Sequence, residues 1–401
     1  MKIKLVLLGV LLLATGIRSY AQGFSSTSTD PNVITTAVPF VSIVPDARGG
    51  AMGDCGVASE ADVFSMSYNP AKYTYLKEDM TVGLGYSPWL RQLAPDMNLA
   101  YLIYGMKLDS KSALAASLRY FSCGDITFTN MQGEEQGTFS PNEWAIDATY
   151  SRMLTDYLSG AVGGRFIYSN LTQNQGEGSN PGWSVAADIG VYYKRPVEWF
   201  RDMDADFAWG VSITNLGSKI SYKSISDDRD FIPTMLRFGP SLKLELDEYN
   251  SLAIMLEASK LLVPTPQVRG AMEVNGVLVD TVVGMDNDVP VMLGVIHSFY
   301  DAPGYALNED NVLEYIGRGY EELCEYNIGL GLEYWYNNVF AVRGGYFNES
   351  ARKGNRKYFA LGAALKYNVF GLDVAYLIPI ASVNGSNPLE NTLRFNLTYS
   401  F

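Results

Sequence analysis

The last nine residues of the chain, Leu393–Phe401, constrain its fold more than any other segment. Successive side chains of a β-strand point to opposite sides, so a strand between an apolar and a polar environment shows strict alternation. This segment alternates without a break, and its apolar face consists of Leu393, Phe395, Leu397, Tyr399 and Phe401. The other face carries only polar side chains. The alternation predicts a strand with one apolar and one polar surrounding.

The same alternation recurs upstream. It covers residues 114–120, 144–150, 162–168 and 183–193. The faces opposite the apolar ones carry Arg119, Asp147, Arg165 and Asp188, and such charges are costly in lipid, so these faces should line an interior. Beyond the first segment, no apolar run approaches the ~18 residues that a spanning helix needs. An all-β fold, a transmembrane antiparallel β-barrel, is therefore expected. Phe395, Leu397, Tyr399 and Phe401 then resemble the assembly signal of outer-membrane barrels.

Connections between the expected strands alternate in length. The tight ones cover residues 109–112, 154–157, 247–250, 336–338 and 368–370, and the long ones cover residues 123–142, 169–182, 217–233, 348–356 and 381–390. In such barrels short turns are periplasmic and long loops extracellular. The connection from Tyr193 to Asp206 is the exception, expected as a longer periplasmic turn.

Residues 261–325 decide the strand count. With Val291–Tyr300 in the wall there would be about fifteen strands, whereas bacterial barrels have an even number. Apolar side chains here recur instead at helical spacing. The candidate partner-binding residues taken from this pattern are Met292, Val295, Phe299, Val312, Ile316 and Tyr320. We predict about fourteen strands and a partly helical extracellular insertion that binds a partner or, alternatively, caps the barrel mouth.

The first part of the chain is expected to have two sections. Residues 1–21 combine Lys2 and Lys4, an apolar run and small residues before Gln22, which predicts a signal peptide cleaved after Ala21 rather than a membrane anchor. Residues 22–79 show little alternation but many turn-forming sequences, and are expected to fold into the lumen as a plug. A periplasmic tail is the alternative. Residues 80–401 would then form the barrel.

Charge and cysteine content exclude some function classes. The net charge is −13, and residues 1–21 contribute only basic side chains, so the mature chain is more acidic still and repels nucleic acid. Cys55, Cys123 and Cys324 form no metal-binding pair and are expected to be small buried residues. A disulfide between two of them is the alternative.

Catalytic and metal sites are not indicated. A single histidine, His297, excludes the two-histidine zinc motif H-E-x-x-H. We expect its side chain to be hydrogen-bonded within the insertion. Ser184 lacks the sequence of a nucleophile elbow, and Asp202, Asp204 and Asp206 lack the Gly and Glu of a calcium loop. The acidic stretches are expected to be solvated. They comprise Asp227, Asp228 and Asp230, and then Glu309, Asp310, Glu314, Glu321 and Glu322. We predict no enzyme activity, cofactor or metal.

A set of motifs along the mature chain resembles a known family. They are residues 36–40, 45–54 (PDARGGAMGD), 67–72 (SYNPAK), 261–266 (LLVPTP), 333–336, 340–347 (FAVRGGYF), 354–359 (GNRKYF) and 391–395 (NTLRF). In this combination they are similar to the PorV family of the Bacteroidota type IX secretion system, although Cys55 stands where a small residue such as Ala is expected. The motif residues carried over as structural plug residues are Pro45, Asp46, Arg48, Asn69, Pro70 and Ala71.

The resemblance implies a non-enzymatic outer-membrane component with a fold similar to the FadL class, a fourteen-stranded barrel with an N-terminal plug. Expected partners are a SprA- or Sov-type translocon barrel, a PorU-type sortase and cargo proteins with C-terminal secretion domains, besides outer-membrane lipid and lipopolysaccharide. A FadL-like passive transporter of hydrophobic small molecules remains the alternative. Neither the cargo, the contacting loop residues nor conduction through the lumen follows from the sequence.

Overall fold

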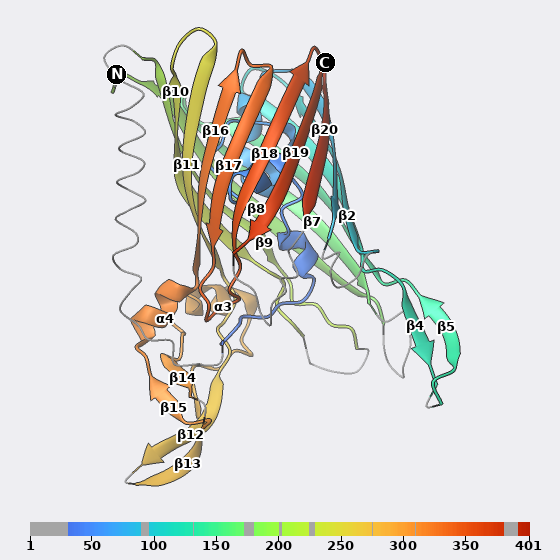
Figure 1. Cartoon of the computed structure of the whole chain (residues 1–401), viewed down its shortest axis with the longest axis vertical. Coiled ribbons are helices and arrows are strands. Elements are labelled where there is room, and N and C mark those ends of the chain that lie inside the picture. The colour runs from blue at the N-terminus through green and yellow to red at the C-terminus, as the bar shows by residue number, and fades with distance from the viewer. Residues whose placement is uncertain are drawn as a thin grey trace.

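The computed structural model describes residues 31–89, 96–130, 132–171, 180–199, 203–223, 229–274, 276–308, 310–380 and 392–401. Within them, fourteen strands form a closed antiparallel barrel, which confirms the predicted fold class (Figure 1). The wall strands are β1 (Met80–Pro88), β2 (Asn98–Lys107), β3 (Ser112–Ser122), β6 (Asn142–Met153), β7 (Leu158–Asn170), β8 (Gly182–Val197), β9 (Ala205–Gly217), β10 (Met235–Glu245), β11 (Asn250–Leu261), β16 (Tyr326–Tyr336), β17 (Phe340–Asn348), β18 (Lys357–Tyr367), β19 (Phe370–Pro379) and β20 (Leu393–Ser400). The expected signal peptide, residues 1–21, lies outside the described residues.

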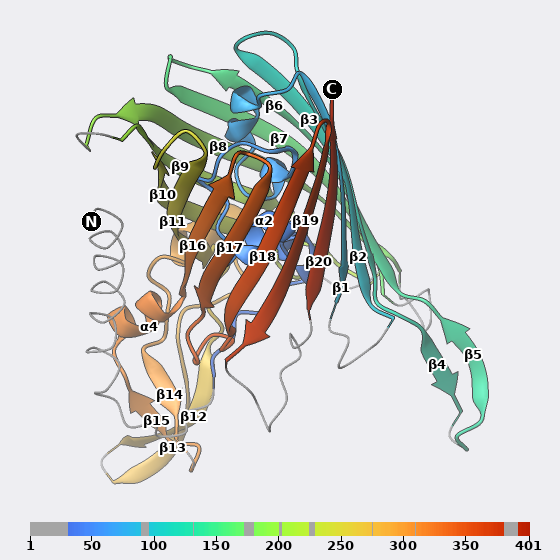
Figure 2. The same ribbon diagram turned by 45° about the horizontal axis from the view of Figure 1, so that its top comes forward.

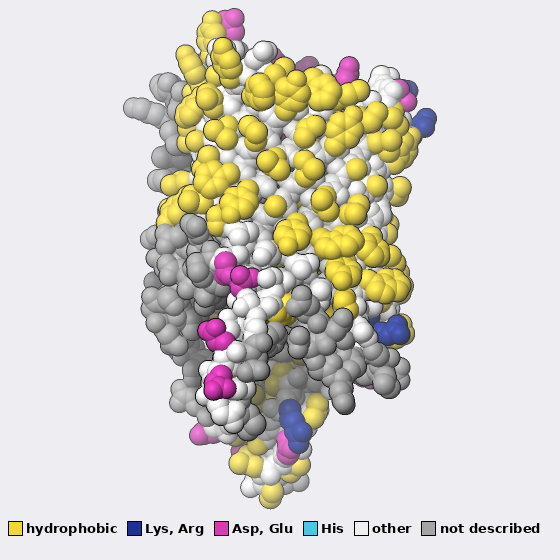
Figure 3. All heavy atoms as spheres, turned by 90° about the vertical axis from the view of Figure 1, so that its right-hand side faces the viewer, with side chains coloured by type: hydrophobic (Ala, Val, Ile, Leu, Met, Phe, Trp, Pro, Cys, Tyr) yellow, Lys and Arg dark blue, Asp and Glu magenta, His cyan; other side chains and the backbone are white. Residues whose placement is uncertain are grey.

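Strand β20 closes the barrel between β19 and β1. Leu397 is opposite Leu372 on one side and Leu84 on the other, and the backbone of Phe401 exchanges two hydrogen bonds with Met80. Its apolar side chains point outward, whereas Arg394 is buried in the lumen. Figure 3 shows hydrophobic side chains spread over the visible part of the wall, as lipid contact requires. Among the described residues, no helix is both long and apolar enough to span a membrane.

Short and long connections gather at opposite ends of the barrel, as predicted. Asn337, Asn338 and Asn368 adopt positive φ angles in the tight turns, where Asn tolerates the left-handed conformation of hairpin turns. The connection expected after Tyr193 is shorter than predicted, because β8 continues to Val197 and β9 begins at Ala205. The loop after β3 contains a hairpin, β4 (Ile126–Thr129) and β5 (Glu135–Phe139).

The segment between β11 and β16 lies outside the wall, at the end of the long loops (Figure 1). We call it the excursion, residues 262–325. It contains the hairpin of β12 (Val268–Val274) and β13 (Val277–Val283), the helix α3 (Val291–His297), the pair β14 (Tyr305–Leu307) and β15 (Leu313–Tyr315), and the helix α4 (Arg318–Cys324). The helical interpretation of Val291–His297 is confirmed.

The helical interpretation of residues 312–323 is wrong in its first half. Residues 313–315 pair as a strand with β14, and the rings of Tyr305 and Tyr315 contact each other across the pair. Gly317 then has a φ of +98°, which no right-handed helix accommodates, so α4 begins only at Arg318. Val312 and Ile316 therefore lie on no common helix face with Tyr320.

Residues 39–76 lie inside the barrel as four short helices (Figure 2). They are η1 (Pro39–Ser42), α2 (Ala47–Ala51), η2 (Val63–Ser67) and η3 (Pro70–Tyr75). Helix α2 packs on β17 to β20, η2 on β1 and β2, and η3 on β3 and β6 to β8. We call residues 39–76 the plug. Because it contacts the wall on several sides, it is held as part of the barrel rather than attached at one point.

Two neighbouring glycines of β17 predict how tightly the plug is packed. A Cβ on Gly345 would lie 2.1 Å from the backbone nitrogen of Gly53, whereas one on Gly344 would meet only a leucine carbon at 4.0 Å. Gly345→Ala should therefore displace the plug and lower the free energy of unfolding by about 1–3 kcal/mol, as overpacking does. Limited proteolysis of the plug and thermal unfolding in detergent measure this. Gly344→Ala is the control, and equal effects of the two changes would contradict the packing described.

Candidate functional site

The plug motif begins with a capped helix. Pro45 is buried just before the N-cap residue Asp46, whose carboxylate accepts hydrogen bonds from the backbone nitrogens of Arg48 at 2.8 Å and Gly49 at 2.7 Å. Such a cap satisfies N–H groups that a helix start leaves without partners. The Asn396 side chain of β20 also donates to Asp46, at 2.8 Å. Asp46 thus ties the start of α2 to the closing strand.

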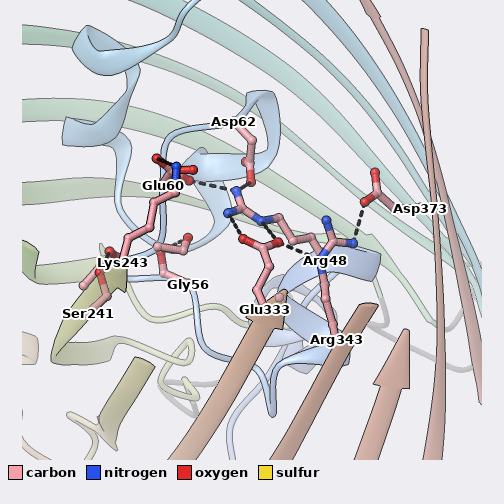
Figure 4. Close-up of polar contacts among 12 residues, drawn as sticks. Arg48, Gly56, Glu60, Asp62, Ser241, Lys243, Glu333, Arg343 and Asp373 are labelled. Atoms are coloured by element: carbon pink, nitrogen blue, oxygen red, sulfur yellow. Dashed lines mark hydrogen bonds and ion pairs between the residues drawn. The ribbon is translucent and has the colours of Figure 1, made fainter. Parts of the chain in front are cut away.

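Arg48 is the main ionic link between plug and wall (Figure 4). Its guanidinium donates to both carboxylate oxygens of Glu333 on β16, at 2.9 and 2.7 Å, and to Asp62 at 2.7 Å. Arg343 on β17 also donates to Glu333, at 2.7 Å, and to Asp373 at 2.6 Å. Two arginines and three carboxylates therefore form one network, in which bidentate geometry makes the Arg48–Glu333 contact specific.

The Asn-Pro-Ala motif holds the other half of the plug. The Asn69 side chain caps η3 by accepting from the backbone nitrogen of Ala71 at 3.1 Å, and donates to the carbonyl of Val191 in β8 at 2.9 Å. The hydroxyl of Ser151 donates to the Pro70 carbonyl, and that of Ser159 to the Ala71 carbonyl, each at 2.7 Å. Small lumen-facing hydroxyls thus provide hydrogen bonds to plug carbonyls, which would be costly to bury without a partner.

Sequence reasoning missed several plug contacts. The carboxylate of Glu257 on β11 accepts from the backbone nitrogens of Gly56 at 2.7 Å and Val57 at 2.8 Å, and pairs with Arg237 at 3.0 Å. The buried Lys72 donates to the Gly56 carbonyl at 2.7 Å. The charged residues of β10 and β11 could have predicted these contacts. Charged side chains of a wall strand face the lumen rather than lipid, and this rule had already placed Arg119 and Asp147 inside.

Two cavities open at the two ends of the lumen. The one beside the tight turns measures about 320 Å³ and is lined by Glu60, Lys77, Lys194 and other charged side chains. The one beside the long loops measures about 260 Å³ and is lined by residues of the segment 33–42 and by Arg356. Most of the plug residues between the two sets are buried. The cavities are therefore mouths on either side of a filled interior.

Helix α3 presents apolar side chains to the outside. Met292 is 61% exposed and Phe299 46%, while Val295 is partly buried. The opposite side, at Gly294, packs against Phe231, so the helix is oriented with much of its apolar surface uncovered. Tyr320 on α4 is also exposed, whereas Val312 and Ile316 are half-buried. The structure brings the α3 residues onto one surface but does not join all six candidates in one patch.

Other expectations have mixed outcomes. His297 is not satisfied as expected, because its Nδ1 is buried without a hydrogen-bond partner and its ring contacts Tyr300 edge-on. Cys55 and Cys324 are buried and Cys123 half-buried, and all three thiols are free. Asp202, Asp227, Asp228, Glu309 and Asn391 lie outside the described residues.

The acidic stretch of α4 corrects another expectation. Glu321 is fully buried rather than solvated, because Lys353 reaches it from the loop between β17 and β18 with a nitrogen–oxygen distance of 3.0 Å. The two residues are 32 positions apart, so the charges close to Glu321 in the sequence could not predict this ion pair.

Comparison with known proteins gives a family and several structural likenesses. The sequence profile of the family described as "Type IX secretion system protein PorV" matches residues 26–268. No curated protein matches the sequence. The chain is similar to the toluene transporter TbuX of Ralstonia pickettii at 10% identity, covering 88% of this chain and 98% of that one with a TM-score of 0.44.

Two further solved structures resemble the chain. The toluene transporter TodX of Pseudomonas putida matches at 10% identity, 88% and 95% coverage and a TM-score of 0.41. A Pseudomonas aeruginosa FadL homologue matches at 10% identity, 92% and 100% coverage and a TM-score of 0.37. With scores this low, the fold assignment rests on the strand pairing of the chain itself.

The Arg48 network predicts a large effect from a single atom change. Glu333→Gln leaves the buried Arg48 and Arg343 without their shared carboxylate, and breaking a buried pair in this way costs about 3–5 kcal/mol. We expect faster proteolysis of the plug and a lower unfolding temperature of the purified protein. Asp280→Asn, which breaks the exposed pair with Arg269, is the matched control and should change neither. A Glu333→Gln protein as stable as the control would show that the network does not hold the plug.

Proposed function

The chain belongs to the PorV family of the type IX secretion system, and on this premise we propose that it is a non-enzymatic cargo adaptor of the outer membrane. It accepts proteins with C-terminal secretion domains from a SprA- or Sov-type translocon. It then delivers them to a PorU-type sortase at the cell surface. The observation that carries the proposal is the filled lumen, because a plug joined to the wall by many buried contacts favours a role for the outer surfaces over passage through the interior.

The contacts of the plug support this assignment. Buried ion pairs and hydrogen bonds join it to wall strands on several sides, among them Arg48 to Glu333 and Asn69 to Val191. Opening a path would require many of these contacts to break together, and each buried charge left unpaired is costly. A plug held in this way fits a scaffold better than a conduit.

The excursion is the surface on which we propose that cargo or its receiving machinery docks. Exposed apolar side chains that gather on a surface, such as Met292 of α3 and Phe299 just after it, are typical of interaction sites, because water contact at such a patch is unfavourable. The excursion lies beyond the long loops, which are extracellular in barrels of this kind. A folded secretion domain emerging at the cell surface would meet it there.

Passive transport of hydrophobic molecules is the second candidate. The cavity at the tight-turn end offers a pathway entrance, yet charged side chains such as Glu60 and Lys194 line it and give an apolar molecule little to bind. Uptake of labelled fatty acid by cells with and without the gene distinguishes the candidates. A loss of uptake on deletion, with secretion intact, would favour the transporter.

Deletion of the gene is the direct test of the adaptor. Proteins with C-terminal secretion domains should disappear from the cell-surface fraction and accumulate in the periplasm, as measured by fractionation and immunoblotting. The intact gene should restore them. Normal surface amounts in the deletion strain would contradict the adaptor function.

The docking surface can be tested by substitution. The double change Met292→Ser and Phe299→Ser removes exposed apolar area from α3 and the turn that follows it, and loss of such anchors typically costs more than about 1 kcal/mol, or roughly a tenfold weaker interaction. We expect less surface cargo and less co-purified cargo at unchanged barrel levels. Ile126→Ser, on the β4–β5 hairpin, is the control for an exposed apolar residue on another loop. Equal defects in both proteins would argue against α3 as the docking site.

A further inference from the structure

Three carboxylates converge where the excursion joins the barrel. Asp301 follows α3, while Glu322 and Glu325 come from α4 and its C-cap. One oxygen of each lies within 4.8 Å of those of the other two. Asp301 and Glu325 are buried, and Glu322 retains partial exposure, so the cluster has one side open to solvent.

The surrounding cations do not balance the charge. Lys260 at the end of β11 pairs with Glu325 at 2.5 Å and with Glu322 at 3.3 Å, and Lys353 pairs with Glu325 at 3.0 Å. Glu321 also pairs with Lys353. Four carboxylates therefore meet two ammonium groups among the contacts described, which leaves two negative charges in a buried setting.

A second observation marks where a ligand would sit. Asp301 is 1% exposed, and its Oδ2 accepts from the backbone nitrogen of Thr265 at 3.0 Å, but its Oδ1 has no hydrogen-bond partner. A buried carboxylate oxygen without a partner is costly and needs an explanation, and a bound cation is one. The other two carboxylates are positioned by neighbours, since Thr265 Oγ1 donates to Glu325 and the Ala302 backbone to Glu322.

We propose that Asp301, Glu322 and Glu325 bind a divalent cation, and we take calcium as the probe because its all-oxygen coordination is flexible in geometry. Calcium takes oxygen ligands at 2.3–2.6 Å, so any two of its ligand oxygens lie no more than about 5 Å apart, a limit that the three carboxylates meet. Carboxylate oxygens can accept more than one contact each, so the lysine pairs and the ion are compatible. Water reaching the open side at Glu322 completes the coordination.

Protons are the competing way to neutralise the cluster. Burial raises the pKa of Asp301 and that of Glu322, because their charged forms are poorly compensated.

Such an ion would join segments that are distant in the chain. Lys260 ends β11, Thr265 follows it, Asp301 lies after α3 and Glu325 precedes β16. Asn32, near the start of the described chain, also reaches this region through hydrogen bonds to the Pro266 carbonyl and Glu321. The site would therefore fix the orientation of the excursion over the barrel mouth, independently of which partner docks there.

The test uses the full-length protein in detergent, freed of metal with EDTA and titrated with calcium chloride by isothermal calorimetry. Hydrogen exchange of residues 301–325 is followed in parallel. We expect saturable binding of one ion per chain and slower exchange in that segment. Asp301→Asn should weaken binding at least tenfold and abolish the calcium effect on exchange.

Asp286→Asn, an exposed acidic residue of the same excursion, is the matched control and should bind calcium as the unmodified protein does. Each variant is checked for a retained barrel fold by gel electrophoresis in SDS without heating, in which folded outer-membrane barrels resist unfolding. Absence of binding at millimolar calcium would overturn the proposal and leave proton and lysine neutralisation in its place. Unchanged binding by Asp301→Asn would do the same.

Discussion

No backbone group of a strand facing lipid can be left without a hydrogen bond, and the architecture of this protein follows from that constraint. The pairing of β20 with β1 satisfies the last open edge and makes the wall continuous. Closure in turn creates an interior that receives one face of every strand, including the buried charges of β3, β6, β7 and β8. The lumen-facing charges then need partners of their own, because the plug excludes the water that would otherwise solvate them.

The plug supplies those partners. Arg48 and Asp46 come from a five-residue helix that would not be stable alone, and their contacts with Glu333 and Asn396 fix it in place. The exchange is mutual, because wall hydroxyls donate to plug carbonyls and the Glu257 carboxylate accepts from plug N–H groups. Glycines such as Gly345 complete the arrangement by letting the two backbones approach each other. A lumen filled in this manner leaves the outer surfaces as the parts of the protein that can meet partners.

The alternation of apolar and polar residues over a few positions was enough to predict the wall of the barrel. Alternation identified the faces of β3, β6, β7, β8 and β20, and the even-number rule placed Val291–His297 outside the barrel. Contacts across long sequence separations were not predictable in this way. Arg48 and Glu333 are 285 residues apart, and the burial of Glu321 depends on Lys353. The helix expected from residue 312 is absent from residues 312–317. The spacing of apolar residues gives no information on the positive φ of Gly317 or on the pairing of β14 with β15.

The excursion combines a buried ionic base with an exposed apolar surface. Its base is anchored by buried ionic contacts around Lys260 and Glu325, whereas Met292 of α3 and Phe299 just after the helix are exposed to the surroundings. A loop that is loosely attached would lose much of its binding free energy to ordering when a partner docks. An apolar surface held rigidly at its base avoids that cost. The ionic base and the apolar surface are therefore parts of one arrangement, in which charge neutralisation at the barrel mouth determines how firmly the outer surface is presented.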